Sequence, residues 1–171
     1  MVSAQDTEAF GELIRRHQSH VRNFLRKLSR DMSVADDLAQ DCFLRAWDKM
    51  HTYSGSGTFI GWLLKIAYTV FLQSKRKSKR YAEILEQVGH VSEAESRMHE
   101  MQAGESADLD RFLAVLSEEE RAILLMSYAC GLSHREISDA TSMPVGSVKS
   151  VIFRGKEKIR TSFDIKDHQH G

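Results

Sequence analysis

Apolar residues recur at three- and four-residue steps over most of the chain, the spacing that places them on one face of an α-helix. In the N-terminal part the pattern predicts three helices, which cover about residues 7–28, 33–50 and 58–80. Ser33 stands where the second helix begins, and Asp36 follows three residues later as in a weak capping box. The stretch Thr52–Gly57, rich in Gly, Ser and Thr, predicts the turn before the third helix.

The helical periodicity fades between Tyr81 and Asp108, where Glu, Ser, Gln and Gly accumulate. This composition predicts a flexible acidic linker, in which Ala94–Met101 could form a short helix. An alternative interpretation is that the acidic segment mimics nucleic acid and shields a basic surface of the free protein.

Helix boundaries are marked more sharply in the C-terminal part. Two capping boxes of the form Ser-x-x-Glu are present, Ser117 with Glu120 and Ser133 with Glu136. Gly131 can end the helix between them in a left-handed conformation, and Pro144 fits the first turn of a last helix. The predicted helices run to about residue 130, from 134 to 141 and from 144 to 162. Two short helices and a tight turn before a longer helix form the helix-turn-helix layout.

Composition and charge give the expected architecture. The single proline and the many Leu, Ala, Glu, Arg and Lys residues favour an all-α protein. The net charge of zero hides a partition: residues 1–80 have 14 basic and 8 acidic side chains, residues 81–110 have 1 and 8, and residues 111–171 have 9 and 8. We therefore expect two small helical domains at 1–80 and 109–171, joined by an acidic linker at 81–108.

Several kinds of site find no support in the sequence. Cys42 and Cys130 lie outside any CxxC spacing, so each is interpreted as a small core residue. His17 and His20 could touch one metal ion, although a solvated helix face is the commoner explanation. Without an HExxH motif, a phosphate loop or a nucleophile–base set, we expect no enzymatic activity, cofactor, metal or small-molecule substrate. The lack of a signal-peptide pattern or long apolar run predicts a cytoplasmic protein.

The last predicted helix has two contrasting faces. One stripe is apolar and should pack inward; it consists of Val145, Val148, Ile152 and Ile159. The other side presents hydroxyls, cations and an aromatic ring, from Ser147, Lys149, Ser150, Phe153, Arg154 and Lys158. Such a surface suits a DNA major groove, where Arg reads guanine edges and apolar atoms meet thymine methyls. An ordinary amphipathic helix has the same pattern, but an outward aromatic ring favours a contact.

The C-terminal part resembles region four of extracytoplasmic-function (group IV) sigma factors of the sigma-70 family. The resemblance is carried by the stretches Leu116–Arg121, Gly131–Ile137 and Pro144–Ser150. In that family, region four binds the minus-35 promoter element. This lobe alone would also fit LuxR-type regulators, which share a similar helix-turn-helix.

The N-terminal part resembles region two of the same family. Ala35–Trp47 is similar to the helix that binds core RNA polymerase, and Phe59–Ala67 is similar to the segment that meets the minus-10 element. Both lobes match in the family's order and at its spacing. The resemblance therefore implies a sigma factor rather than a regulator with a helix-turn-helix alone.

By this resemblance, the Ala35–Trp47 helix docks the clamp helices of the polymerase largest subunit, and the chain also meets the polymerase flap. The residues expected to bind core polymerase are Asp37, Leu38, Gln40, Asp41, Phe43, Arg45 and Trp47. A surface of carboxylates and apolar groups suits a basic amphipathic partner. Leu38, Phe43 and Trp47 could instead all be core residues, but one helix of so small a lobe cannot bury every side.

The resemblance places promoter contacts in both lobes, with duplex DNA and with the melted strand. The Tyr53–Thr58 loop matches the position that captures an unstacked base, where glycine permits close approach and hydroxyls can hydrogen-bond. Residues expected at the minus-10 element are Tyr53, Ser54, Ser56, Thr58, Phe59, Trp62, Lys65, Thr69, Gln73, Lys75 and Arg76. Those expected at the minus-35 element are Ser133, Arg135, Ser147, Lys149, Ser150, Phe153, Arg154 and Lys158. Phe59 and Trp62 could equally be core residues.

Five positions depart from the family's usual pattern. Tyr68-Thr69 replaces a frequent Arg-Asn, and Gln73 replaces a frequent Asp, so the preferred minus-10 bases stay open. Val151 stands where a basic residue is frequent, which should weaken phosphate anchoring. Gly155 replaces the usual Ala and should cost about 1 kcal/mol of helix stability.

The expected function is that of an alternative sigma factor, a non-enzymatic subunit that carries core RNA polymerase to specific promoters. The resemblance further implies a stress or envelope response and control by an anti-sigma factor. A helix-turn-helix regulator or anti-activator that binds duplex DNA without polymerase is the alternative, and it leaves the Ala35–Trp47 helix without a role.

Overall fold

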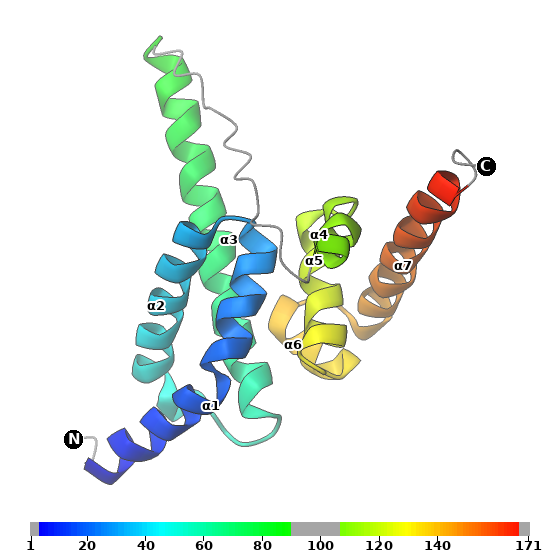
Figure 1. The fold of residues 1–171 in the computed structure, drawn as a ribbon. Coiled ribbons are helices and arrows are strands. Elements are labelled where there is room, and N and C mark those ends of the chain that lie inside the picture. Colours follow the sequence, from blue (N-terminus) through cyan, green and yellow to red (C-terminus); the bar gives the residue numbers. More distant parts are fainter. Residues whose placement is uncertain (1–3, 90–106, 168–171) are drawn as a thin grey trace.

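The computed structural model describes residues 4–89 and 107–167, and these residues form helices and no strand (Figure 1). The N-terminal helices are α1 (Ala4–Ser29), α2 (Met32–Asp48), the short 3-10 helix η1 (Met50–Thr52) and α3 (Phe59–Gln87). The C-terminal helices are α4 (Ala107–Ala114), α5 (Glu118–Leu124), the π-helical turn η2 (Leu125–Ala129), α6 (His134–Thr141) and α7 (Val145–Asp167). The predicted all-α class is confirmed.

Helices α1, α2 and α3 pack against one another and form the N-terminal lobe. Helix α2 faces its neighbours with small side chains, since Ala35, Ala39 and Cys42 are all buried. The Cys42 thiol donates to the carbonyl oxygen of Leu63 in α3 at 3.8 Å, and burial raises the pKa of this thiol to about 12. Cys42 is therefore a core residue of the kind that the sequence indicated.

Two boundaries of the N-terminal lobe differ from the prediction. The N-cap of α2 is Asp31 and not Ser33: its backbone is extended, and its carboxylate accepts from the Val34 N–H at 3.0 Å. Helix α3 continues past Arg80 to Gln87, because no Gly or Pro interrupts it before Gly89, whose φ is +72°. The acidic composition after Arg80 thus belongs at first to an exposed helix. The short helix expected over 94–101 lies outside the described residues.

The C-terminal lobe has the predicted helix-capping features. In both capping boxes the serine side chain accepts from the N–H of the glutamate, whose carboxylate accepts from the serine N–H in return. Gly131 is left-handed, with φ +69°, as expected where the first long helical stretch ends. Helix α4 was not predicted, because it follows directly on the acidic stretch. It is held by tertiary packing, including contact between the Phe112 ring and the Phe163 ring in α7, whose centroids are 4.2 Å apart.

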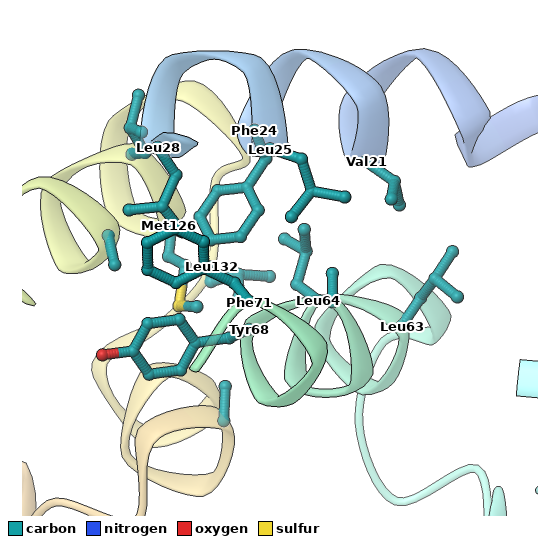
Figure 2. Close-up of a cluster of buried hydrophobic side chains, with 14 of the residues drawn as sticks. Val21, Phe24, Leu25, Leu28, Leu63, Leu64, Tyr68, Phe71, Met126 and Leu132 are labelled. Atoms are coloured by element: carbon teal, nitrogen blue, oxygen red, sulfur yellow. The ribbon is translucent and has the colours of Figure 1, made fainter. Parts of the chain in front are cut away.

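The two lobes share a buried apolar cluster (Figure 2). Helix α1 contacts α5 and η2, while α3 contacts α6. The labelled members of the cluster are Val21, Phe24, Leu25 and Leu28 from α1, Leu63, Leu64, Tyr68 and Phe71 from α3, and Met126 and Leu132 from the C-terminal lobe. Each fully buried large apolar side chain contributes about 1.5–3 kcal/mol of burial free energy. The lobes are therefore packed together rather than merely tethered.

Gly155 is buried where α7 crosses α5, and its role differs from the one expected. A Cβ atom at this position would lie 2.8 Å from Leu124 Cδ1 and 3.3 Å from Leu124 Cδ2. A methyl group here would therefore force the Leu124 side chain to shift, so the helix cost of glycine, about 1 kcal/mol, is set against tight packing between α5 and α7.

We predict that Gly155→Ala fails to stabilise the protein, although helix propensity favours alanine by about 1 kcal/mol. The added methyl forces Leu124 to shift, and such overpacking typically costs about 1–3 kcal/mol. Gly146→Ala is the matched control, because a Cβ there meets nothing within 4 Å. Urea denaturation should show a gain for Gly146→Ala and none for Gly155→Ala. An equal gain at both positions would show that the α5–α7 contact does not constrain residue 155.

Candidate functional site

A cleft of about 830 Å³ lies between the lobes, at the N-terminal end of α3. One wall is the loop after η1 together with the first turns of α3, including Ser54, Trp62 and Lys65. The other wall is the helix-turn-helix segment from Ser133 to Pro144. Side chains expected at the minus-10 element thus face side chains expected at the minus-35 element across one cleft.

The Glu136 carboxylate connects the two walls of this cleft. Glu136 accepts hydrogen bonds from the Thr58 side-chain hydroxyl and from the Thr58 N–H, the latter at 3.1 Å. Within its own lobe, Glu136 also accepts from the N–H of Ser133 at 2.9 Å. Partial burial raises the pKa of Glu136, but the bonds from Thr58 and Ser133 outweigh it and bring the pKa to about 2. The side chain is therefore ionised at neutral pH.

The loop at the cleft is braced by aromatic rings. Tyr53, Phe59 and Trp62 lie with their ring centroids 5.4–5.6 Å apart, and the Tyr53 hydroxyl donates to the Gly57 carbonyl at 3.0 Å. Phe59 is buried, whereas Trp62 is half-buried and donates from its indole N–H to Thr52 Oγ1 at 3.3 Å. Phe59 is thus placed in the core, and Trp62 lines the cleft.

A second groove, of about 550 Å³, runs between α2 and α3 on the N-terminal lobe. Its α2 wall includes Asp37, Asp41 and Leu44, and Leu44 is 67% exposed. Arg45 Nη1 donates to the side-chain oxygen of Gln73 across the groove, and Arg45 also pairs with Asp41 at 3.5 Å. The groove combines carboxylates with an exposed apolar side chain, a composition suited to an amphipathic helical partner.

The outward face of α7 forms a third surface. Phe153 is 67% exposed, and Arg154 beside it is also exposed. Both line a groove of about 450 Å³ with Val115, which lies just after α4. An aromatic ring and a guanidinium that share an accessible helix face can reach base edges in a major groove.

Comparison with known sequences matches both lobes. The family model described as Sigma-70 region 2 matches residues 13–81, and the model described as Sigma-70, region 4 matches residues 106–159. The ECF RNA polymerase sigma factor RpoE of Cereibacter sphaeroides is 31% identical over 158 residues, which span 91% of this chain and 87% of that protein. SigE of Mycolicibacterium smegmatis, also an ECF sigma factor, is 32% identical over 158 residues, which span 89% of this chain and 60% of that protein.

The chain belongs to the extracytoplasmic-function sigma factors of the sigma-70 family. The fold agrees with this assignment. The sigma factor RpoE of Bartonella quintana, solved in complex with the anti-sigma factor NepR, superposes with a TM-score of 0.75 at 24% identity, over 92% of this chain and 98% of that one.

In this sigma factor, the residues expected to bind core polymerase divide between surface and core. Asp37, Gln40 and Asp41 are exposed, whereas Leu38 is 6% exposed and lies in the core. Three others are half-buried, namely Phe43, Arg45 and Trp47. Phe43 and Trp47 are tied to α1, since Arg22 lies over the Phe43 ring at 5.8 Å and Phe10 meets the Trp47 ring edge-on at 5.1 Å. Sequence reasoning missed Leu44, whose exposure the helical spacing from Asp37 and Asp41 would have indicated.

The residues expected at the minus-10 element lie on α3 and in the loop before it. Several already have partners: Ser54 and Ser56 bond to each other at 2.9 Å, and the Thr69 hydroxyl donates to the Lys65 carbonyl at 2.8 Å. Lys75 pairs with Glu118 of the C-terminal lobe at 2.6 Å. Arg76 is exposed. The C-terminal lobe therefore engages the same helix face that the resemblance assigns to DNA.

Residues expected at the minus-35 element are mostly on the surface. Those exposed are Ser133, Arg135, Lys149, Ser150, Phe153, Arg154 and Lys158, while Ser147 is half-buried. Lys158 also binds both carboxylate oxygens of Glu120, at 2.7 and 2.8 Å, so it serves the capping box of α5. The expectation for Val151 was wrong. This side chain is 2% exposed and packs in the lobe core, so it takes no phosphate-facing position.

Arg121 connects the two lobes and was not expected to do so. Its buried guanidinium donates to three carbonyl oxygens, those of Leu113, Leu116 and Leu28, each at 3.2 Å. Leu28 belongs to α1, so the third bond crosses between the lobes. Burial lowers the pKa of Arg121, and the three acceptors compensate its lost hydration.

Other chemistry was not found in the described parts of the chain. Among residues 4–89 and 107–167, no group of three His, Cys, Asp or Glu side chains could hold a metal ion. The His17 and His20 rings lie 6.3 Å apart, and His17 instead meets the Phe59 ring at 5.5 Å. None of the described helices has the length and apolar character needed to span a bilayer.

We predict that Arg121→Lys destabilises the protein by about 2–4 kcal/mol, because an ammonium cannot reach all three carbonyls and each buried unsatisfied group costs about 1–3 kcal/mol. Arg111→Lys is the control, since the Arg111 side chain is 56% exposed. Thermal and urea denaturation measure both. A loss below about 1 kcal/mol for Arg121→Lys would contradict the importance of the three bonds.

Proposed function

We propose that this sigma factor acts as a non-enzymatic, cytoplasmic subunit that carries core RNA polymerase to specific promoters through three surfaces. The α2–α3 groove docks the polymerase, the loop at Tyr53–Thr58 with α3 meets the minus-10 element, and α7 meets the minus-35 element. The observation that carries the proposal is that one chain combines an accessible polar and apolar groove on α2 with an accessible helix-turn-helix. A plain regulator needs only the second.

The proposed division of labour follows the lobes. Residues 1–80 bind polymerase and recognise and melt the minus-10 element, residues 109–171 recognise the minus-35 element, and residues 81–108 connect them. The seven helical residues after Arg80 extend α3 into this connection. Melting is driven by binding energy, since the bases captured at the loop compensate the lost stacking.

The direct experiment is initiation with purified core polymerase and this chain on fragments of the host genome. We expect specific start sites, whose upstream sequences then define the promoter. Core polymerase that neither binds the chain nor starts transcription with it would refute the proposal.

The exposed Leu44 allows polymerase docking to be tested without loss of stability. We predict that Leu44→Ala weakens core-polymerase affinity about 5- to 30-fold, as expected when a central apolar contact worth about 1–2 kcal/mol is removed. Met32→Ala is the control, because Met32 is 57% exposed near the other end of the same helix. Fluorescence anisotropy with core polymerase measures both affinities. A helix-turn-helix regulator that acts without polymerase would show no effect of Leu44→Ala at all.

Arg154 tests whether α7 reads bases. If its guanidinium reads a base edge, Arg154→Ala should cost about 1–3 kcal/mol on the cognate minus-35 element and relax specificity there. Holoenzyme binding to cognate and mismatched promoters measures this difference. A uniform loss on all sequences would instead assign Arg154 to phosphate contact alone.

We also propose control by an anti-sigma factor in a stress or envelope response. The similar fold of the Bartonella quintana protein was solved with such a partner, NepR. The groove on α2 and the outward face of α7 are both accessible for one. Purification of the chain from its host should recover a bound regulatory protein that competes with core polymerase. Recovery of an always-active chain without such a partner would argue against this control.

A further inference from the structure

We propose that the packed arrangement of the lobes is a self-closed resting state, in which Glu136 latches the helix-turn-helix to the minus-10 loop through Thr58. This inference rests on the proposed function, since it takes the loop as a promoter-binding surface. It requires no partner protein, because both halves of the latch belong to the chain itself.

The latch joins the N-termini of two helices from different lobes. Thr58 is the N-cap of α3, and its side chain accepts from the Gly61 N–H at 3.2 Å. Glu136 is the third residue of α6 and belongs to that helix's capping box. One carboxylate therefore serves the start of α6 and the start of α3 together, and the positive end of each helix dipole favours its charge.

Gly61 shows how closely the latch is built. A Cβ atom at this position would lie 3.2 Å from Glu136 Oε1 and 3.1 Å from Thr58 Oγ1, tighter than ordinary contacts. The absence of a side chain in the first turn of α3 thus gives the carboxylate of the other lobe its access.

The closed arrangement cannot hold both promoter elements at once. The minus-10 and minus-35 elements lie about 25 base pairs apart, which is roughly 85 Å at 3.4 Å per base pair of B-DNA. In the structure, the loop assigned to one element and the lobe assigned to the other are within hydrogen-bond distance, since Thr58 N and Glu136 Oε1 are 3.1 Å apart. Promoter binding therefore requires that the lobes separate.

Closure ties up polar groups of one functional surface and leaves the other two without such contacts to the opposite lobe. It engages Thr58 with Glu136 and Lys75 with Glu118, and α6 lies along α3. By contrast, Leu44 and Phe153 are each 67% exposed. A closed chain can thus present its polymerase-docking groove while Thr58 of its minus-10 loop is bonded to Glu136. Polymerase and promoter bind the open form better, and this difference in affinity shifts the equilibrium toward opening.

The rim of the interface is suited to reversible opening. Besides the latch, Lys27 of α1 pairs with Asp110 of α4 at 2.6 Å, and Lys75 pairs with Glu118 at 2.6 Å. The Lys75 and Glu118 side chains are 54% and 47% exposed, so water replaces that contact readily when the lobes part. The apolar cluster around Met126 then accounts for most of the resistance to opening.

The test compares two glutamates that hold the same place in two capping boxes. Glu136→Gln keeps a capping side chain on α6, because glutamine also completes a capping box, but it removes the charge that binds Thr58. Glu120→Gln is the matched control, since among residues 4–89 and 107–167 the Glu120 carboxylate bonds to Ser117 and Lys158 of its own lobe and to no group of the other. The measurement is amide hydrogen exchange of the 53–61 segment in the free, full-length chain, with small-angle scattering for overall size.

Within the 53–61 segment, we expect slow exchange of the Thr58 N–H in the wild-type chain and about 3- to 10-fold faster exchange of it in Glu136→Gln, the range for loss of one net hydrogen bond. Glu120→Gln should leave that segment unchanged. Addition of core polymerase to the wild-type chain should release the segment as well. Equal exchange in the wild-type chain and Glu136→Gln, or an equal effect of the two substitutions, would overturn the latch.

A charge reversal gives independent evidence should Glu136→Gln fail to fold. Lys27→Glu places two carboxylates against each other between α1 and α4, so it should shift the equilibrium toward the open form and speed exchange of the Thr58 N–H. Asp110→Lys in the same chain should restore the slow exchange. Unchanged exchange in Lys27→Glu, or no rescue in the double variant, would count against closure. Both readouts use the free chain, so they decide closure even if the chain proved unable to bind polymerase.

Discussion

The burial of Met126 and Leu132 against α1 and α3 is the interaction on which the arrangement of this molecule depends. Each lobe is small, and domains near 60 residues bury only about 60% of the surface that their unfolded chains expose. A shared apolar cluster lets the lobes stabilise each other. It also sets the register between them, and this register brings the start of α6 to the start of α3.

Helix ends supply most of the polar contacts between the lobes. Arg121 reaches the last turns of α1 through the Leu28 carbonyl, and Glu136 reaches the first turn of α3. The terminal carbonyls and N–H groups of helices lack partners within their own helix, so they are available to a neighbouring domain. The lobes are thereby joined by backbone groups that almost any sequence would provide, in combination with a few charged side chains.

Local signals in the sequence predicted the helices well. Capping boxes, Gly131 and the spacing of apolar residues act within a few residues, and they placed α5, α6 and the start of α3 correctly. The boundaries that failed had weaker local signals: Ser33 competed with a better cap at Asp31, and α3 continued through an acidic stretch that contains no helix breaker.

The candidate surfaces were harder to predict, because exposure depends on tertiary packing. Val151 stands where the family often has a basic residue, and Leu38 stands where the resemblance expects polymerase contact. Packing of each helix against its neighbours nevertheless buries both side chains. Leu44, by contrast, is exposed although its side chain is apolar. Contacts between the lobes, such as Glu136 with Thr58, join residues 78 positions apart and leave no periodic signal in the chain.

In the proposed scheme Thr58 serves both promoter binding and closure of the free chain. These two properties therefore cannot change independently. The same hydroxyl and N–H that we propose to face a promoter base also hold Glu136. A substitution that alters base choice at this position must therefore alter how often the chain stands open without polymerase. In relatives that carry such a substitution, promoter selectivity and background transcription would change together. Residues 58 and 136 would then be expected to evolve as a pair.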